Sequence, residues 1–191
     1  MLEEKALYFV NLKSFQEDSF EGSVTQVTID KIKLTKGNLM KVVDLGRSLI
    51  YASCWHLNED ESAAMWRQYA NWGKGIAIQS SVYRLKAALK NTEKDISIGT
   101  INYIDYKTQE IKDLNVYTWA MHKRKHFEAD REVRAIFMDN GNKDGFLISI
   151  NLEELIERIV VSPSSPEWFR ELIHKILIRH GIDKEVRFSD I

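Results

Sequence analysis

Four charged residues precede or interrupt an apolar segment and could perform chemistry there: Glu128, Asp130, Glu132 and Arg134. The segment from Glu132 to Met138, EVRAIFM, predicts a β-strand. Because side chains alternate along a strand, Glu132 and Arg134 share one face, and apolar residues on both faces predict a covered strand. Glu132 would then be a partly buried carboxylate at the strand mouth, able to act as a base or to stabilise an oxocarbenium-like centre. The alternative is a structural ion pair that closes the sheet.

Aromatic side chains gather in the segment 53–75, which holds three of the five tryptophans and the only cysteine. Helical spacing places Trp66 and Tyr69 on one face of a short helix. Together with Trp55, such a face could stack on a base or on a nicotinamide ring. Packing in the core is the alternative use of these residues.

A basic run from His122 to His126 falls in a segment for which a helix from Val116 to about Phe127 is expected. Five consecutive helical positions spread around the circumference, so the run favours a solvated helix surface over a phosphate-binding face. His122 and His126 have the i, i+4 spacing of metal ligands, but a zinc site needs three or four converging groups. We therefore predict no metal site.

The elements that must position these residues follow from apolar spacing and from caps. Asn58 is expected to begin the Trp66 helix, which Gly73 ends. Strands are expected at 6–12, 48–55, 75–79, 96–106, 132–138, 145–152, 158–163 and 186–189, with helices at 39–47, 82–90 and 166–180. The segment 24–34 fits either a strand or an irregular helix. Asp139 to Gly145 predicts a hairpin turn.

This mixture of strands and helices predicts an α+β fold: a mixed, largely antiparallel sheet with flanking helices in a single domain over residues 1–191. The formal net charge of −1 gives no overall basic field for nucleic acid. One cysteine fits a reducing compartment, and no apolar run approaches membrane-spanning length. We therefore expect a cytoplasmic protein that does not enter a membrane.

A set of segments spread over nearly the whole chain resembles the DUF2971 family of bacterial and phage proteins. The segments are LYFVNLKSFQEDSFEG, SCWHLNEDESAAMWRQYA, GIAI, INYIDY, KHFEADREVRAIF and IVVSP. The chain departs from the family pattern at Asp130, where Glu is common. The resemblance places Lys125 toward Glu132, implies that the chain lacks an N-terminal segment, and implies a role in phage–host conflict. It fixes no activity.

The sequence leaves open whether the protein is an enzyme. One hypothesis is a nucleotide-binding or ADP-ribosyltransferase-like enzyme that uses NAD, with Glu132 as the catalytic carboxylate. Trp66 or Tyr69 would hold the nicotinamide, and Lys125 or Arg134 would clamp the diphosphate. This hypothesis requires the Glu132 strand mouth and the Trp66 helix to face each other across a ligand-sized gap.

Two further hypotheses need no catalysis. The first is a module that binds a protein partner through an exposed patch. The second is a nucleic-acid-binding protein, which the charge balance disfavours.

Overall fold

The protein was analysed as a computed structural model, which describes residues 1–15, 18, 20–32, 36–113, 115–141 and 143–191. Its contacts divide the chain into two compact units that interleave along the sequence. Unit one comprises Met1–Leu7, Asn58–Glu93 and Ile148–Ile191, and unit two comprises Tyr8–Leu57 and Lys94–Leu147. Each unit is assembled from segments that are distant in the sequence.

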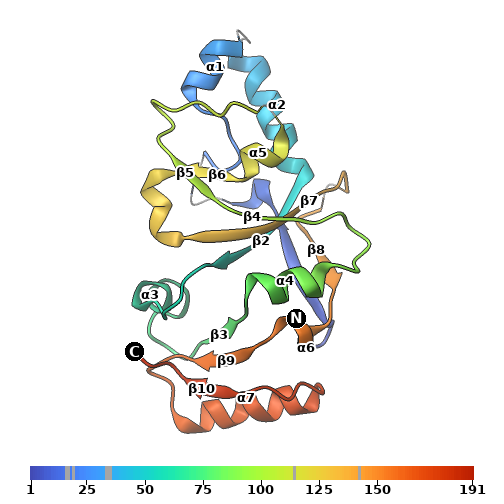
Figure 1. Cartoon of the computed structure of the whole chain (residues 1–191), viewed down its shortest axis with the longest axis vertical. Coiled ribbons are helices and arrows are strands. Elements are labelled where there is room, and N and C mark those ends of the chain that lie inside the picture. The colour runs from blue at the N-terminus through green and yellow to red at the C-terminus, as the bar shows by residue number, and fades with distance from the viewer. Residues whose placement is uncertain (16–17, 19, 33–35, 114, 142) are drawn as a thin grey trace. The chain divides into compact units, whose positions relative to one another are not determined.

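A five-stranded sheet, in the order β4-β7-β2-β1-β8, organises unit two (Figure 1). Its strands are β1 (Ala6–Asn11), β2 (Ile50–His56), β4 (Ser97–Thr100), β7 (Glu132–Met138) and β8 (Gly145–Ser149). A short parallel pair, β5 (Asn102–Ile104) and β6 (His122–Arg124), accompanies it. The helices are η1 (Leu12–Ser14), α1 (Gln26–Ile32), α2 (Lys36–Leu49), α5 (Val116–Ala120) and η2 (Lys125–Asp130).

The strand β7 carries Glu132 and Arg134, and both of its edges are paired with other strands. It is antiparallel to β2, with Cys54 opposite Arg134, and antiparallel to β4, with Gly99 opposite Arg134. Apolar residues on its two faces are buried, as the sequence predicted. The ring of Phe137 stacks on Tyr51 at a centroid distance of 5.5 Å and meets Phe9 edge-on at 5.3 Å.

Three sequence predictions for unit two are corrected. The turn after β7 does not form a β7–β8 hairpin, because β2 and β4 occupy both edges of β7 and β8 is at the sheet edge beside β1. The expected strand 96–106 divides into β4 and β5, where the backbone N–H of Asn102 turns to the Met121 carbonyl. The expected helix from Val116 ends at Ala120, because the chain then extends to pair β6 with β5. The segment 24–34 contains the helix α1.

A three-stranded sheet, in the order β10-β9-β3, organises unit one. Its strands are β3 (Ile76–Gln79), β9 (Arg158–Val161) and β10 (Val186–Phe188), with β9 parallel to β10 and antiparallel to β3. The helices are α3 (Ala63–Ala70), α4 (Val82–Leu89), α6 (Leu152–Leu155) and α7 (Glu167–Arg179). The fold class is therefore α+β with a mainly antiparallel principal sheet, as predicted.

The helix α3 begins four residues later than predicted. The cap is Ser62, whose hydroxyl accepts a hydrogen bond from the backbone N–H of Met65, and not Asn58. Glu61 is instead engaged by the chain's C-terminal segment: its carboxylate accepts hydrogen bonds from Ser189 and from the backbone N–H of Asp190. Among the described helices, none is long and apolar enough to cross a membrane.

Candidate functional site

A buried ion network in unit two is built around Arg134, whose side chain has no exposed surface. Its Nε donates to Glu132 Oε2 over 2.7 Å, and its Nη1 donates to Glu21 Oε1 over 2.6 Å. Nη1 also donates to the backbone carbonyl of Ala120, at the end of α5, over 2.8 Å. Burying a guanidinium is costly unless its donors are paired, so the bonds of Nε and Nη1 fix the loop carrying Glu21 and the end of α5 against β7, while Nη2 has no partner among the described residues.

Both carboxylate oxygens of Glu132 are engaged. Oε2 accepts from Arg134, and Oε1 accepts from Lys123 Nζ over 2.6 Å. Burial favours the neutral acid, but Arg134 and then Lys123 outweigh it and hold the pKa of Glu132 below its usual value. The backbone N–H of Glu132 donates to the Tyr103 hydroxyl over 2.8 Å. Glu132 is thus an ionised carboxylate with its charge already balanced by two cations.

The lysine that reaches Glu132 is Lys123 and not Lys125. Lys123 lies on β6, is buried, and also donates to Asp130 over 2.7 Å. Burial alone would lower the pKa of Lys123, but its hydrogen bonds to Asp130 and Glu132 raise it overall. Lys125 follows β6 in the 3₁₀ helix η2 and is exposed. The resemblance placed Lys125 toward Glu132, but the ion pair is made by Lys123, two residues earlier, because Lys123 lies on β6 and Lys125 on the exposed turn that follows.

A separate ion pair involves the next residue on β6, Arg124. Arg124 Nη2 lies 2.7 Å from Asp18 Oδ1, and the guanidinium sits 4.8 Å from the centre of the Phe20 ring. Counting Asp18, Glu21, Asp130 and Glu132 against Lys123, Arg124 and Arg134 leaves one excess negative charge. Lys123 and Arg124, two of the five residues of the basic run, are therefore already engaged in ion pairs, which does not favour a phosphate-binding surface.

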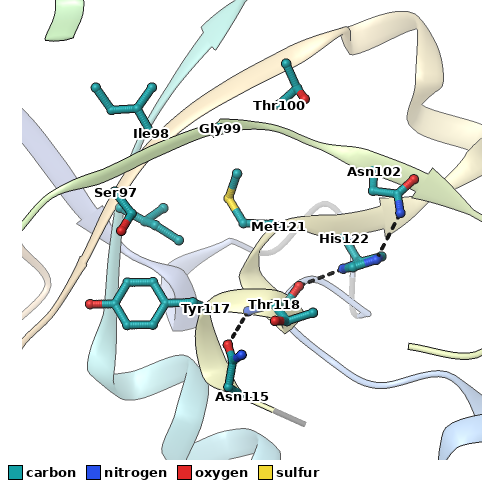
Figure 2. A pocket seen from close by; sticks show the side chains of 11 residues that line it. Ser97, Ile98, Gly99, Thr100, Asn102, Asn115, Tyr117, Thr118, Met121 and His122 are labelled. Atoms are coloured by element: carbon teal, nitrogen blue, oxygen red, sulfur yellow. Dashed lines mark hydrogen bonds between the residues drawn. The ribbon is translucent and has the colours of Figure 1, made fainter. Parts of the chain in front are cut away.

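A pocket of about 390 Å³ lies in unit two between β4, α5 and β6 (Figure 2). Its wall includes the β7 residue Ile136, which shares a strand face with Arg134 and Glu132. The lining otherwise comes from β4, the start of β5, α5 and β6, through Ser97, Ile98, Gly99, Thr100, Asn102, Asn115, Tyr117, Thr118, Met121 and His122. Sequence reasoning did not find this pocket, because its lining comes from short, separate segments that carry no recognisable motif.

The polar groups of the pocket wall are held in fixed positions. His122 Nδ1 lies 2.7 Å from the Thr118 carbonyl and therefore carries hydrogen, and Nε2 lies 3.1 Å from Asn102 Nδ2 and accepts from it (Figure 2). These two contacts hold the imidazole ring in place. Asn115 caps α5 by accepting from the Thr118 backbone N–H over 2.8 Å.

Close packing of β4 on α5 depends on Gly99. A Cβ at this position would lie 2.8 Å from Met121 Cε. Figure 2 shows the Met121 side chain beside the β4 ribbon at Gly99, in the middle of the pocket wall. Met121 follows Ala120, whose carbonyl is bonded to Arg134. The buried ion network therefore supports one wall of the pocket.

The aromatic residues do not form the shared face that helical spacing predicted. Trp66 is 7% exposed and its Nε1 donates to Glu61 Oε2 over 3.1 Å, whereas Tyr69 is 75% exposed. Trp66 is therefore a core residue and not a stacking platform. Trp55, on β2, is half-buried, and its Nε1 donates to Ser53 Oγ over 3.2 Å.

The predicted site residues are divided between the units. Glu132, Arg134, Lys125 and Trp55 belong to unit two, and Trp66 and Tyr69 belong to unit one. The expectation that the Glu132 strand and the Trp66 helix enclose a ligand stays a prediction. The structure brings Glu132 and Arg134 into direct contact, and adds Glu21 and Lys123, which the sequence did not single out.

The histidine spacing considered for metal binding is also lost, because His122 lies in β6 and His126 in η2. Within the described ranges of the chain, no three His, Cys, Asp or Glu side chains converge to hold a metal ion.

Comparison with family models, curated proteins and solved structures finds no match to this chain. The resemblance to DUF2971 therefore stays a prediction.

Proposed function

We propose that this protein binds a small nucleotide-type ligand in the pocket between β4, α5 and β6. The observation that carries the proposal is the pocket itself: a hollow of about 390 Å³, open to solvent, whose lining mixes polar and apolar groups. Tyr117 adds an aromatic side chain to the wall, and Asn102, Asn115 and Thr118 add amides and a hydroxyl. This mixture suits a heterocycle with a sugar attached.

Rigidity of the wall supports binding. Arg134 ties the end of α5 to β7, and His122 and Asn102 bond to each other across β6 and β5. Side chains that are already fixed lose little conformational entropy when a ligand arrives. The buried network therefore serves the pocket by positioning it.

The enzymatic form of this proposal is ADP-ribosyltransferase-like chemistry on NAD, with Glu132 as the catalytic carboxylate. The ionised state of Glu132 supports this role, because a developing oxocarbenium ion needs a negative charge. The pairing of Glu132 with both Lys123 and Arg134 opposes it, since one oxygen would have to be released first. We therefore propose ligand binding as the primary function, and place catalysis and a role in phage–host conflict second to it.

Thermal unfolding in the presence of adenosine, uridine, AMP, UMP and NAD at millimolar concentration tests the proposal. A ligand present at a hundred times its dissociation constant stabilises the folded state by about 2.7 kcal/mol, which shifts Tm by several degrees. The shift should be lost in Asn102→Ala and kept in Asn91→Ala, which changes an exposed amide in unit one. Absence of a shift with all five compounds would remove the proposal.

A protein-interaction module is the second candidate, and one observation in unit one favours it. Trp168 and Leu172, one turn apart on α7, are 54% and 43% exposed, and Lys74 Nζ lies 4.8 Å from the Trp168 ring centre. Large apolar residues at a surface are common at interaction sites. If Trp168→Ser with Leu172→Ser abolishes a biological effect of the protein while the nucleotide-induced Tm shift remains, this candidate replaces the first.

A further inference from the structure

The outer edge of β4 presents backbone hydrogen-bonding groups. Ile101 donates its N–H to the Glu132 carbonyl over 2.9 Å, and the register pairs Gly99 with Arg134 and Ser97 with Ile136. Bonding alternates along an antiparallel strand, so these residues bond toward β7. The intervening residues Ile98 and Thr100 therefore direct their N–H and C=O groups away from β7.

That outer edge borders the pocket. Two residues after Thr100, Asn102 donates its N–H to the Met121 carbonyl over 2.9 Å, so the chain itself occupies the edge at that point. Ile98 and Thr100 both line the pocket, and among the described residues their outward N–H and C=O groups have no backbone partner. Each presents one donor beside one acceptor. A nucleobase edge, which also places a donor beside an acceptor, is complementary to such a pair.

The charge of the pocket lining indicates which part of a nucleotide can bind there. No Lys, Arg, Asp or Glu side chain belongs to the lining. The cations that follow His122 on β6, Lys123 and Arg124, and the β7 residue Arg134 are all paired to carboxylates. A phosphate inside this pocket would find no cationic partner.

We propose that the pocket takes the uncharged base of a nucleoside, bound edge-on to the outward N–H and C=O groups of Ile98 and Thr100, with any phosphate outside the pocket. This inference rests on the proposed function, and specifies the part of the ligand that is recognised and the groups that recognise it. Tyr117, on α5, then contacts the base or the sugar from the opposite wall, and Asn102 contacts it from the end of the β4 edge.

Titration calorimetry with modified nucleosides tests the ligand side. Uridine is compared with 3-methyluridine, and adenosine with N6,N6-dimethyladenosine, because each methylation removes the donor from the base edge. Losing a hydrogen bond of this kind should weaken binding by about tenfold. UMP and AMP should bind no more tightly than uridine and adenosine.

The results separate this inference from the function on which it rests. Equal affinity for a nucleoside and its methylated form, or binding of nucleotides without binding of nucleosides, would overturn the edge-on arrangement while leaving a nucleotide-type site. If no nucleoside and no nucleotide binds, both the edge-on arrangement and the proposed function are overturned.

Two variants at one position test the protein side. Thr100→Pro removes the outward N–H without removing a bond to β7, a substitution that edge strands accept, whereas Thr100→Ala keeps the N–H and removes only the side chain. The proline variant should bind the unmodified nucleoside about tenfold more weakly, and the alanine variant should bind nearly as the natural protein does. Equal binding by the proline variant contradicts the inference. If circular dichroism shows that this variant is unfolded, the methylated nucleosides decide.

Discussion

Arg134 and Glu132 face the same side of β7, and their side chains are joined by a hydrogen bond of 2.7 Å between Nε and Oε2. This contact gives the Glu132 carboxylate, at the start of β7, a structural role as the partner of Arg134. The same guanidinium reaches Glu21 and the Ala120 carbonyl, so one buried side chain holds three segments of unit two. The pocket wall formed by α5 depends on that arrangement.

Replacing Arg134 should destabilise unit two strongly. Arg134→Met keeps much of the side-chain volume but leaves the buried carboxylate of Glu21 and the oxygen of Glu132 without their cation, which costs about 3–5 kcal/mol of unfolding free energy. Urea denaturation measures this loss. The control is Arg170→Met, which breaks an exposed pair with Glu167 and should cost less than about 1 kcal/mol. A loss at Arg134 no larger than that control would refute the structural role.

The stabilisation contributed by Glu132 should depend on pH. The pKa of Glu132 in the folded protein lies below the value of about 4.5 expected when the side chain is free, so its contribution is present above that pH. It is lost as the pH falls further, through the folded-state pKa. The difference in unfolding free energy between the natural protein and Glu132→Gln should therefore be large at pH 7 and shrink below about pH 4.5. A difference that stays constant down to pH 3.5 would show that the charge of Glu132 contributes nothing.

Adding a methyl group at Gly99 should reduce binding more than stability. The new Cβ would meet the flexible end of Met121, which lines the pocket and must move aside. We expect Gly99→Ala to unfold within about 1 kcal/mol of the natural protein while weakening nucleoside binding by about tenfold. The double variant Gly99→Ala with Met121→Ala should recover binding, because the obstructing side chain is gone. Normal binding by the single variant would show that Gly99 and Met121 do not line the binding site.

Trp66 and Tyr69 should respond very differently to truncation, although they lie three residues apart on α3. Trp66→Ala removes a buried indole and its hydrogen bond to Glu61, at a cost of about 3–5 kcal/mol. Tyr69→Ala, at a position that is 75% exposed, should cost less than about 1 kcal/mol. Thermal unfolding of both variants checks this ordering. Equal losses would mean that Tyr69 also packs in the core.

Much of the sheet could be predicted from local sequence. The bounds of β7 follow from EVRAIFM, because apolar residues on both faces require a covered strand, and β1 and β2 follow from similar apolar runs. The alternation rule also placed Glu132 and Arg134 on one face, where they meet. These features depend on interactions within a few residues, which spacing records directly.

The site depends on partners that spacing cannot record. Glu21 is 113 residues from Arg134 in the sequence, and nothing in its own neighbourhood distinguishes it from other acidic loop residues. The short length of α5 also follows from a distant partner, because the chain after Ala120 extends as β6 to pair with β5. Because α5 ends early, Lys123 lies on β6, from which it reaches Glu132. Periodicity likewise gave Trp66 and Tyr69 one face, but eight residues of α3 bury only a narrow stripe.

Backbone chemical shifts measured during titration with a nucleoside test the central claim most directly. We expect the amide signals that move to belong to the pocket of unit two, foremost Ile98, Thr100, Asn102 and Tyr117, and the signals around Tyr69 to stay still. Shifts centred on Tyr69 and Trp66, or no shifts at millimolar nucleoside and nucleotide, would contradict it.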